Sequence, residues 1–534
     1  MRRLTRDHII VVVLATSALA YSFTYFDHDL NPSDEGYLVF GVSRVLSGQM
    51  PGADFHAYEP GRYWLMAPFF ALFGTDVLVE RAVLLIHRVA IVVLVFLCGR
   101  RFLPTVHALI PTVTTLVLPG PWHKSWFALM LLLALLSAAR YLEKPSDRRL
   151  AVGGVLSGTA LLFRLDLGVF SIVLWGIAHI ARTSRESMPS WARGARRWLR
   201  FVSWAAVPVG LAGGWYAMQG KLAAALSFYL SEYLHASGDL ERIHPKIAGF
   251  PSLGRAISSF PENLFHIVIW ASIVSFVALA TSILIRARRE RCVPWPEVLL
   301  AATWCCAFVA VAVQPDRSHL LQNGPPLYLV GVAALVALGR ELGGHTHHRL
   351  AAVMPIVLLG ALVAENLLAP DINAYYTGSI RMRFGPQVRA GLPHATVKLP
   401  PWIAEEYHGL LDFVRSSSSP GDGVATCFCL PMINVMADRP NPTGLDILFP
   451  HTVGRTDQQL RYLAELRKTR FFIANRCELD HDRPTHCPPS DQTLVDFAPT
   501  IVEEVRSRWR PVYTSVHGFV TVFENPNFDD ARSR

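Results

Sequence analysis

The sequence predicts a polytopic α-helical membrane protein that ends in a C-terminal extracytoplasmic α/β domain. Hydrophobic residues make up 51% of the 534 residues and charged residues only 17%, with a mean hydropathy of +0.31. This composition is too apolar for a soluble chain of such length. Apolar runs long enough to cross a bilayer recur up to about residue 370. From about Asp371 onward such runs become rare, and Pro and charged residues become more frequent.

The apolar runs predict about eleven membrane spans of roughly 20 residues each. The first run, 9–26, follows three arginines and could be taken for a signal peptide. It lacks a convincing small-residue cleavage site and more spans follow, so we interpret it as a retained span. The predicted spans centre on Leu14, Val89, Thr112, Leu132, Val155, Val173, Pro208, Ser275, Phe308, Ala334 and Val357.

Basic residues predict the orientation of these spans. Arginine clusters fall in alternate loops, and such loops face the cytoplasm. The N-terminus is therefore predicted to be cytoplasmic, and an odd number of spans places the C-terminal segment outside. The net charge of +9 largely reflects this bias. Because the charge is split among short loops, it favours contact with anionic lipid headgroups and argues against nucleic acid as a partner.

We therefore predict a multi-span domain over 1–370 with an extracytoplasmic first loop at 27–76, a Gly- and Pro-rich linker over 371–400, and a soluble domain over 401–534. Alternating helix and strand patterns in the last part predict a small α/β sandwich. The predicted helices cover 403–415, 457–468 and 494–509, and the predicted strands cover 423–427, 470–474, 511–515 and 519–523.

Eight cysteines divide evenly between the two parts of the chain. Four lie in or near the membrane part, where we interpret them as apolar filler: Cys98, Cys292, Cys305 and Cys306. The others, Cys427, Cys429, Cys477 and Cys487, lie in the outer domain, where a disulfide such as Cys477–Cys487 is expected. A zinc site is the alternative, but the Cys-x-Cys spacing is tighter than the usual ligand pair, which favours disulfides or free thiols.

Two adjacent carboxylates, Asp34 and Glu35, directly follow the first span and are the leading candidates for catalysis. A carboxylate at the membrane interface can act as a general base on an acceptor hydroxyl or amine. The structural alternative is that Ser33 caps a helix that starts at Asp34 and ends near Gly48. Acidic residues in a first turn are also favoured by the helix dipole, so both interpretations stay open.

Further polar residues gather in loops that the alternation places on the same outer side. Positive-inside bias should deplete such loops of basic residues, yet three very short ones each keep a cation. Cations there can bind a phosphate whose lipid tail lies between spans, which points to a polyprenyl-phosphate donor. Snorkelling to headgroups or pairing with a neighbouring acid is the alternative for each residue alone. We predict phosphate binding by Lys124, Arg164, Arg317, His319 and His123, supported by Asp54, Glu59, Arg62, Asp166 and Asp316.

Several short motifs together resemble those of bacterial GT-C-fold membrane glycosyltransferases, in particular the protein O-mannosyltransferase and lipid A aminoarabinose transferase group. Each motif is short and degenerate, but together they extend over most of the chain. They are the Asp34-Glu35-Gly36 sequence, Asp54-Phe55 with Tyr58 to Tyr63, Phe73-Gly74 ahead of Arg81, Phe163 to Gly168, Asp316 to Leu320, and Ala437 to Thr443.

This resemblance implies a GT-C-like fold in the bacterial cytoplasmic membrane and transfer of a hexosyl or pentosyl group from a polyprenyl-phosphate donor. A first-loop acid, Asp34 or Glu35 here, would be the catalytic or acceptor-orienting residue. The family implies either no cofactor or a divalent cation, for which Asp34, Glu35, Asp54 and Asp166 offer oxygen ligands. No acceptor-binding pattern is recognisable between Lys221 and Asn263, so lipid, glycan and protein acceptors all stay open.

Two other functional classes compete with this interpretation. A lipid or glycan transporter or flippase would also need charged groups along a path through the membrane. Only His87 and Arg88 lie near a span centre, the other polar residues cluster at one surface, and no inverted repeat is evident. A non-catalytic envelope assembly protein is the third class.

Overall fold

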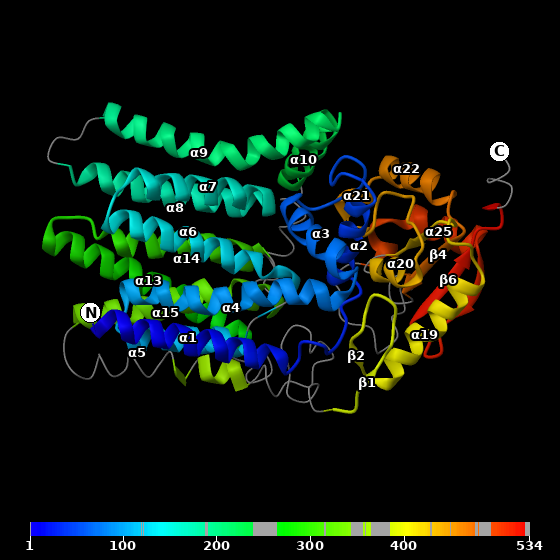
Figure 1. Cartoon of the computed structure of the whole chain (residues 1–534), viewed down its shortest axis with the longest axis horizontal. Coiled ribbons are helices and arrows are strands. Elements are labelled where there is room, and N and C mark those ends of the chain that lie inside the picture. The colour runs from blue at the N-terminus through cyan, green and yellow to red at the C-terminus, as the bar shows by residue number, and fades with distance from the viewer. Residues whose placement is uncertain are drawn as a thin grey trace. The chain divides into compact units, whose positions relative to one another are not determined.

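A computed structural model describes most of the chain, and its helices and strands are shown in Figure 1. The described residues are 2–118, 120, 122–186, 191–238, 252, 264–313, 317–342, 356–357, 359–364, 385–427, 430–448, 450–475, 479 and 493–528. They fall into two compact units that are interleaved along the sequence. The helical unit comprises Met1–Phe26, Ala82–Gln219 and Leu240–Phe384, and the α/β unit comprises Asp27–Arg81, Gly220–Asp239 and Gly385–Arg534.

The helical unit consists of long apolar helices that run alongside one another (Figure 1). In the described part of the chain, eight helices are long and apolar enough to cross a membrane. The predicted polytopic helical membrane protein is therefore confirmed. The eight are α1 (Arg2–Phe23), α4 (Val77–Phe102, whose first turn belongs to the other unit), α6 (Trp126–Glu143), α8 (Leu165–Ser184), α9 (Trp191–Met218), α13 (Leu264–Glu290), α14 (Trp295–Val313) and α15 (Arg317–Leu342), and the unit also contains the shorter α5 (Thr105–Val117) and α7 (Asp147–Phe163).

Eight of the predicted span centres lie on those eight helices. Thr112 lies on α5 and Val155 on α7, which have 13 and 17 residues and are shorter than a usual span. Val357 lies in a stretch that the structure describes only in part.

Two glycines allow α7 to pack closely against α9. A Cβ atom at Gly154 would lie 2.5 Å from the carbonyl oxygen of Phe201, and one at Gly158 would overlap the backbone of Ala205. Glycines four residues apart lie on the same face of a helix, and this spacing is typical of close helix contacts in membranes.

A four-stranded mixed sheet forms the centre of the C-terminal part of the α/β unit. Its order is β3-β4-β6-β5, with β3 parallel to β4 and the other pairs antiparallel. The sheet confirms the predicted α/β fold class. The strands are β3 (Val424–Thr426), β4 (Phe471–Asn475), β5 (Arg510–Thr514) and β6 (Val520–Glu524), and the helices are α19 (Pro401–Ser416), α20 (Pro431–Ala437), α21 (Pro450–Val453), α22 (Thr456–Leu466), α24 (Leu494–Phe497) and α25 (Pro499–Arg508).

Alternation along β4 places helices on both faces of this sheet. Phe472 and Ala474 belong to a core that includes residues of α22 and α25. Phe471 points the other way and meets Phe413 of α19, with ring centroids 5.8 Å apart. Because successive side chains of a strand face opposite sides, this arrangement makes a three-layer sandwich.

The first loop contributes α2 (Asp34–Leu46) and α3 (Gly61–Phe73) to the α/β unit, which also contains α10 (Leu222–Gly238) and a short ribbon of β1 (Val388–Arg389) and β2 (Lys398–Leu399). Helix α2 packs directly on α20. A Cβ at Gly36 would lie 2.5 Å from the backbone nitrogen of Met432. Near the other end of α2, the Arg44 guanidinium donates to both carboxylate oxygens of Asp446 at 2.9 and 2.6 Å. Burial raises the pKa of Asp446, and Arg44 opposes this effect.

The structure describes five of the eight cysteines on which predictions were made. Cys427 is buried in the core of the sheet, and Cys98 and Cys306 are buried in the helical unit. Cys429, Cys477 and Cys487 lie outside the described residues, so the expected Cys477–Cys487 disulfide stays a prediction.

Candidate functional site

Helix α2 begins at Asp34, as predicted, but its cap differs from the prediction. Ser33 makes no side-chain capping bond, so the predicted Ser33 cap is wrong. Instead, the Asn31 side-chain oxygen accepts hydrogen bonds from the backbone N–H groups of Ser33 at 3.0 Å and Asp34 at 2.9 Å. Asparagine takes this role because its short amide reaches the unpaired N–H groups at a helix start. The cap fixes the backbone that carries both candidate carboxylates.

Glu35 is completely buried in an ion pair with Arg81. The guanidinium donates to both carboxylate oxygens, through Nε at 2.7 Å and Nη2 at 2.9 Å. It also donates to the backbone carbonyl groups of His28 and Asp29 at 2.8 and 2.7 Å. The backbone N–H of Asn31 donates to the same carboxylate at 3.1 Å. Glu35 therefore ties the first turn of α2 to the chain that precedes it and to α4.

Asp34 lies in a different environment from its neighbour. Its side chain is only half-buried. The Asn31 amide lies 3.5 Å from its Oδ2 atom, at the outer limit of a hydrogen bond. Of the two adjacent acids, Asp34 is thus the more exposed.

A third carboxyl group, Glu80, lies next to this pair. It is fully buried on the first turn of α4, and neither of its oxygens has a hydrogen-bond partner within the described residues. It interacts electrostatically with Glu35, Asp34 and Arg81. A buried carboxyl group without hydrogen-bond partners is costly, so Glu80 joins Asp34 and Glu35 as part of the candidate site.

The supporting residues of the first loop are held by local pairs. Asp54 accepts from the Lys221 ammonium at 2.6 Å and from the backbone N–H of Met50 at 2.8 Å. Glu59 and Arg62 lie 3.9 Å apart, and the Arg62 guanidinium stacks 4.3 Å from the ring centroid of Tyr58. These contacts order the loop between α2 and α3.

In the helical unit, three of the predicted loops converge on one another. Arg164 pairs with Asp166 at 2.9 Å and stacks on the Phe127 ring, 4.3 Å from its centroid. The rings of Trp126 and Phe163 lie 4.9 Å apart. The starts of α6 and α8 therefore meet.

The turn before α6 also meets the start of α15. Gly120 has a left-handed φ of 73°, and a Cβ there would lie 3.1 Å from the backbone of Leu321. The following 3-10 turn, η1 (Trp122–Lys124), carries His123 and Lys124. Glycine is needed at position 120 both for this φ and for the close approach to α15.

The residues of the helical unit that were predicted to bind phosphate differ in burial and in their contacts. Lys124 is half-buried and makes no hydrogen bond or ion pair with the described part of the chain. His123 is buried, and His319 lies in the first turn of α15, where its carbonyl accepts from Asn323 at 3.0 Å. For Arg317 the structure describes only the backbone, and Asp316 lies outside the described residues.

Arg88, an ionisable residue within a span, has structural partners. Its guanidinium donates to the Tyr25 hydroxyl and to the Gly120 carbonyl, both at 2.5 Å, and lies 3.4 Å from the ring centroid of Trp122. These contacts hold the turn at Gly120. They give the buried Arg88 a structural role, so its burial is not evidence for a transport path.

The carboxylates that could bind a divalent cation do not form a ligand set. Glu35, Asp54 and Asp166 are each paired with a basic side chain. Within the described residues, no group of three or more His, Cys, Asp and Glu side chains is arranged to hold a metal ion.

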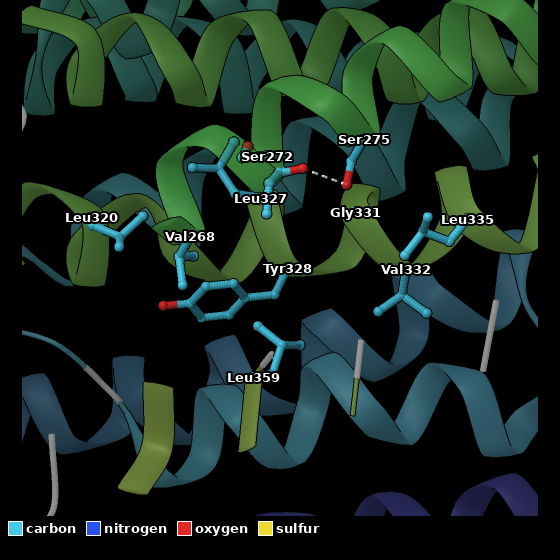
Figure 2. Close-up of a pocket in the computed structure, with 11 residues that line it drawn as sticks. Val268, Ser272, Ser275, Leu320, Leu327, Tyr328, Gly331, Val332, Leu335 and Leu359 are labelled. Atoms are coloured by element: carbon cyan, nitrogen blue, oxygen red, sulfur yellow. Dashed lines mark hydrogen bonds between the residues drawn. The ribbon is translucent and has the colours of Figure 1, made fainter. Parts of the chain in front are cut away.

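Figure 2 shows an apolar pocket between α13 and α15 in the helical unit. Its volume of about 50 Å³ is far below the ~300 Å³ of a small-molecule site. The Tyr328 hydroxyl is buried there without a hydrogen-bond partner in the described part of the chain. We assign no ligand to this pocket.

Sequence reasoning missed three residues of the site: Asn31, Glu80 and Arg81 had no predicted role. Arg81 appeared only as part of a motif. The adjacent acid and base at the start of an apolar run were a usable signal for both Glu80 and Arg81, because ionisable residues at a span end need partners.

Comparison with protein-family models and with curated protein sequences gave no match. Among solved structures, the oligosaccharyltransferase AglB of Archaeoglobus fulgidus, in complex with an inhibitory peptide and a dolichol-phosphate, matches with a TM-score of 0.53 and 12% identity over 99% of this chain and 75% of that chain. The same enzyme in its apo form matches with a TM-score of 0.50 and 11% identity over 89% and 70%.

ArnT of Cupriavidus metallidurans, bound to undecaprenyl phosphate, matches with a TM-score of 0.46 and 13% identity over 97% of both chains. The fold assignment rests on the two archaeal structures. They confirm the GT-C fold that the sequence motifs predicted.

Proposed function

We propose that the protein transfers a sugar from a polyprenyl-phosphate donor to an envelope acceptor, with Asp34 as the general base. The observation that carries this proposal is the contrast between two adjacent acids. Glu35 is sealed in a pair with Arg81, whereas Asp34, one residue away, is held at a capped helix start and stays accessible. A fixed, accessible carboxylate beside a sequestered one is suited to accept a proton from a bound nucleophile.

In the proposed reaction an acceptor hydroxyl oxygen attacks the anomeric carbon of the donor sugar. The bond between that carbon and the phosphate oxygen breaks, and the lipid phosphate leaves with the electron pair. The Asp34 carboxylate takes the proton of the attacking hydroxyl. Glu35 acts as a positioning residue, since its bonds to Arg81 and Asn31 hold the turn that carries Asp34.

We assign binding of the donor phosphate to the cations of the helical unit. Lys124 is the leading candidate, because it has no partner among the described residues to neutralise its charge. His123, Arg164, His319 and Arg317 are proposed to assist, and Arg164 would have to share its charge with Asp166. Cationic groups stabilise the charge that develops on a leaving phosphate. The dolichol-phosphate bound to the archaeal neighbour supports this donor class.

The proposed location is the outer face of a bacterial cytoplasmic membrane, with the N-terminus in the cytoplasm. The proposed domains keep the limits 1–370, 371–400 and 401–534. The transferred group is proposed to be hexosyl or pentosyl.

A transfer assay with purified full-length protein in nanodiscs tests this function. Radiolabelled polyprenyl-phosphate sugars would be supplied as a panel, with membrane extract as acceptor. Label that moves into lipid, glycan or protein supports the enzyme. Movement of the donor across a vesicle membrane without a covalent product would favour the transporter or flippase class. Neither transfer nor movement with any donor would favour a non-catalytic assembly protein.

A further inference from the structure

A polar cleft of about 560 Å³ lies within the α/β unit. Its volume falls in the range of about 300–1,000 Å³ that is usual for small-molecule sites. Four separate segments line it: the first loop at His56, α10 at Ser231, the turn at Thr443 and Leu445, and the stretch from Thr452 to Glu465 that contains α22.

Helix α22 contributes most of the charged lining. Gln458, Arg461, Tyr462 and Glu465 recur at intervals of three and four residues and so share one face of the helix. Asp457 lies between two guanidinium groups, 3.0 Å from Arg455 Nε and 3.1 Å from Arg461 Nη2. Each arginine side chain has five N–H donors. Since each contacts Asp457 through one nitrogen, other N–H groups can donate to a ligand.

His56, which also lines the cleft, is held in place by two neighbouring aromatic residues. The Tyr37 hydroxyl donates to the His56 carbonyl at 2.9 Å and lies 3.1 Å from the ring Nδ1 atom. Phe228 packs edge-on against the imidazole with centroids 5.2 Å apart. Tyr37 is on α2, three residues after Asp34, so the cleft shares a rigid element with the proposed base.

The cleft is lined mainly by side chains that donate and accept hydrogen bonds, together with a smaller apolar part. Guanidinium groups donate, carboxylates accept, and the hydroxyl groups of Ser231, Thr443 and Thr452 do both. A sugar hydroxyl also donates and accepts, so a carbohydrate satisfies such a lining. A lipid chain would meet Leu445 and the ring of Tyr462 as apolar contacts, but most of the lining residues are polar.

We propose that this cleft binds the acceptor and that the acceptor is a carbohydrate. This proposal rests on the proposed sugar transfer. Of the lipid, glycan and protein acceptors that the sequence left open, it selects the glycan. The acceptor glycan would lie against α22, with Arg455 and Arg461 donating to its hydroxyl groups.

The first test measures binding without any donor. Full-length protein in nanodiscs would be titrated with neutral tri- and tetrasaccharides of glucose, mannose and galactose, and with short Ser- and Thr-containing peptides, by saturation-transfer NMR. Arg461→Ala and Arg455→Ala should each weaken saccharide binding roughly tenfold, as expected for lost hydrogen bonds from a charged donor. Both side chains are more than half exposed, so the variants should fold.

Arg467→Ala is the matched control, because Arg467 ends the same helix, is 54% exposed and pairs with Glu504 outside the cleft. It should bind saccharides like the wild type. If no saccharide binds, or if the cleft variants bind as tightly as the control, the proposal is wrong. Peptide binding that depends on Arg461 would also overturn it.

The second test separates this proposal from the proposed function. In the transfer assay, Arg461→Ala should raise the KM for the acceptor glycan while the KM for the lipid donor stays unchanged. Transfer with an unchanged acceptor KM would reject the cleft and keep the enzyme. Arg461-dependent saccharide binding without any sugar transfer would reject the enzyme and keep the cleft as a carbohydrate site.

Discussion

At the scale of single residues, the site is organised by a buried ion pair whose partners are 46 positions apart in the sequence. Arg81 uses three of its nitrogens to hold Glu35 and the carbonyl groups of His28 and Asp29. A buried ion pair contributes little to the free energy of folding compared with two apolar side chains of similar size, but removing one partner leaves a buried charge without compensation. The pair of Glu35 and Arg81 therefore fixes the geometry of the site and adds little stability.

Replacing Arg81 alone should destabilise the protein strongly. We expect Arg81→Met to lower the free energy of unfolding by about 3–5 kcal/mol, because Glu35 would stay buried without its partner. The double variant Glu35→Leu with Arg81→Met should recover much of the loss. Thermal unfolding of the detergent-solubilised variants measures both effects. A double variant no more stable than the single one would contradict this account.

Asp27 should make stability depend on pH in the acid range. Burial alone would raise the pKa of Asp27, but the hydrogen-bonded Lys398 ammonium and the nearby His28 lower it below its ordinary value of 3.8. A carboxyl group with a lowered pKa contributes stability above the unfolded value, and this is lost as the pH falls through the folded value.

The difference in melting temperature between the wild type and Asp27→Asn should therefore be present at pH 7 and shrink progressively as the pH falls below 3.8. Melting curves across this range measure it. A difference that is the same at neutral and at strongly acidic pH would show that the ion pair with Lys398 is not its cause.

Residue-level prediction from the sequence succeeded where the signal was local. The start of α2 at Asp34 was predicted from a serine that precedes two acidic residues, and the helix begins there although Ser33 makes no capping bond. Asn31, and not Ser33, provides the capping oxygen because of the path of the backbone before the helix. The identities of the neighbouring residues do not predict that path. Arg81 and Glu35 meet only because two distant segments fold together, so their pairing could not be read from spacing.

At the scale of elements, two glycines of α7 bring its backbone close to the backbone of α9. Their spacing, Gly154 to Gly158, was present in the sequence and predicts a tight helix interface in a membrane. Hydropathy alone predicts only a membrane span for this segment. The backbone of α9 approaches both glycines, which leaves no room for a side chain.

Gly158→Ala should therefore destabilise the helical unit, by about 1–3 kcal/mol as is typical of overpacking. Gly213→Ala on α9 is a suitable control, because a Cβ there meets nothing within 4 Å in the described part of the chain. The melting temperature should fall for Gly158→Ala and stay the same or rise for Gly213→Ala. Equal melting temperatures of the two variants would contradict the account, because they would mean that α7 and α9 can move apart without loss of stability.

Elements of the α/β sandwich were predicted well because strands and helices alternate with clear periods. Strand β4, predicted over 470–474, forms at Phe471–Asn475. The helix predicted over 494–509 is instead two helices, α24 and α25, with Pro499 as the first residue of the second. Proline cannot donate to the preceding turn, so this break was a signal that the prediction overlooked.

At the scale of the whole molecule, the chain passes repeatedly between its two units. The first loop belongs with the C-terminal segment, as the bond between Arg44 and Asp446, 402 positions apart, shows. Hydropathy separates spans from loops, but it does not show which loops pack together. The GT-C fold was nevertheless recognisable from motifs spread over the chain, and the structural comparison confirms it.

The central claim is that Asp34, and not its neighbour, removes the proton from the acceptor. The most direct measurement is the turnover of purified Asp34→Asn in nanodiscs, beside Asp27→Asn as a first-loop control, with each melting temperature recorded. The account predicts a loss of about 10²–10⁴-fold for Asp34→Asn without a change in melting temperature, and near wild-type turnover for the control. Full turnover by folded Asp34→Asn would contradict it.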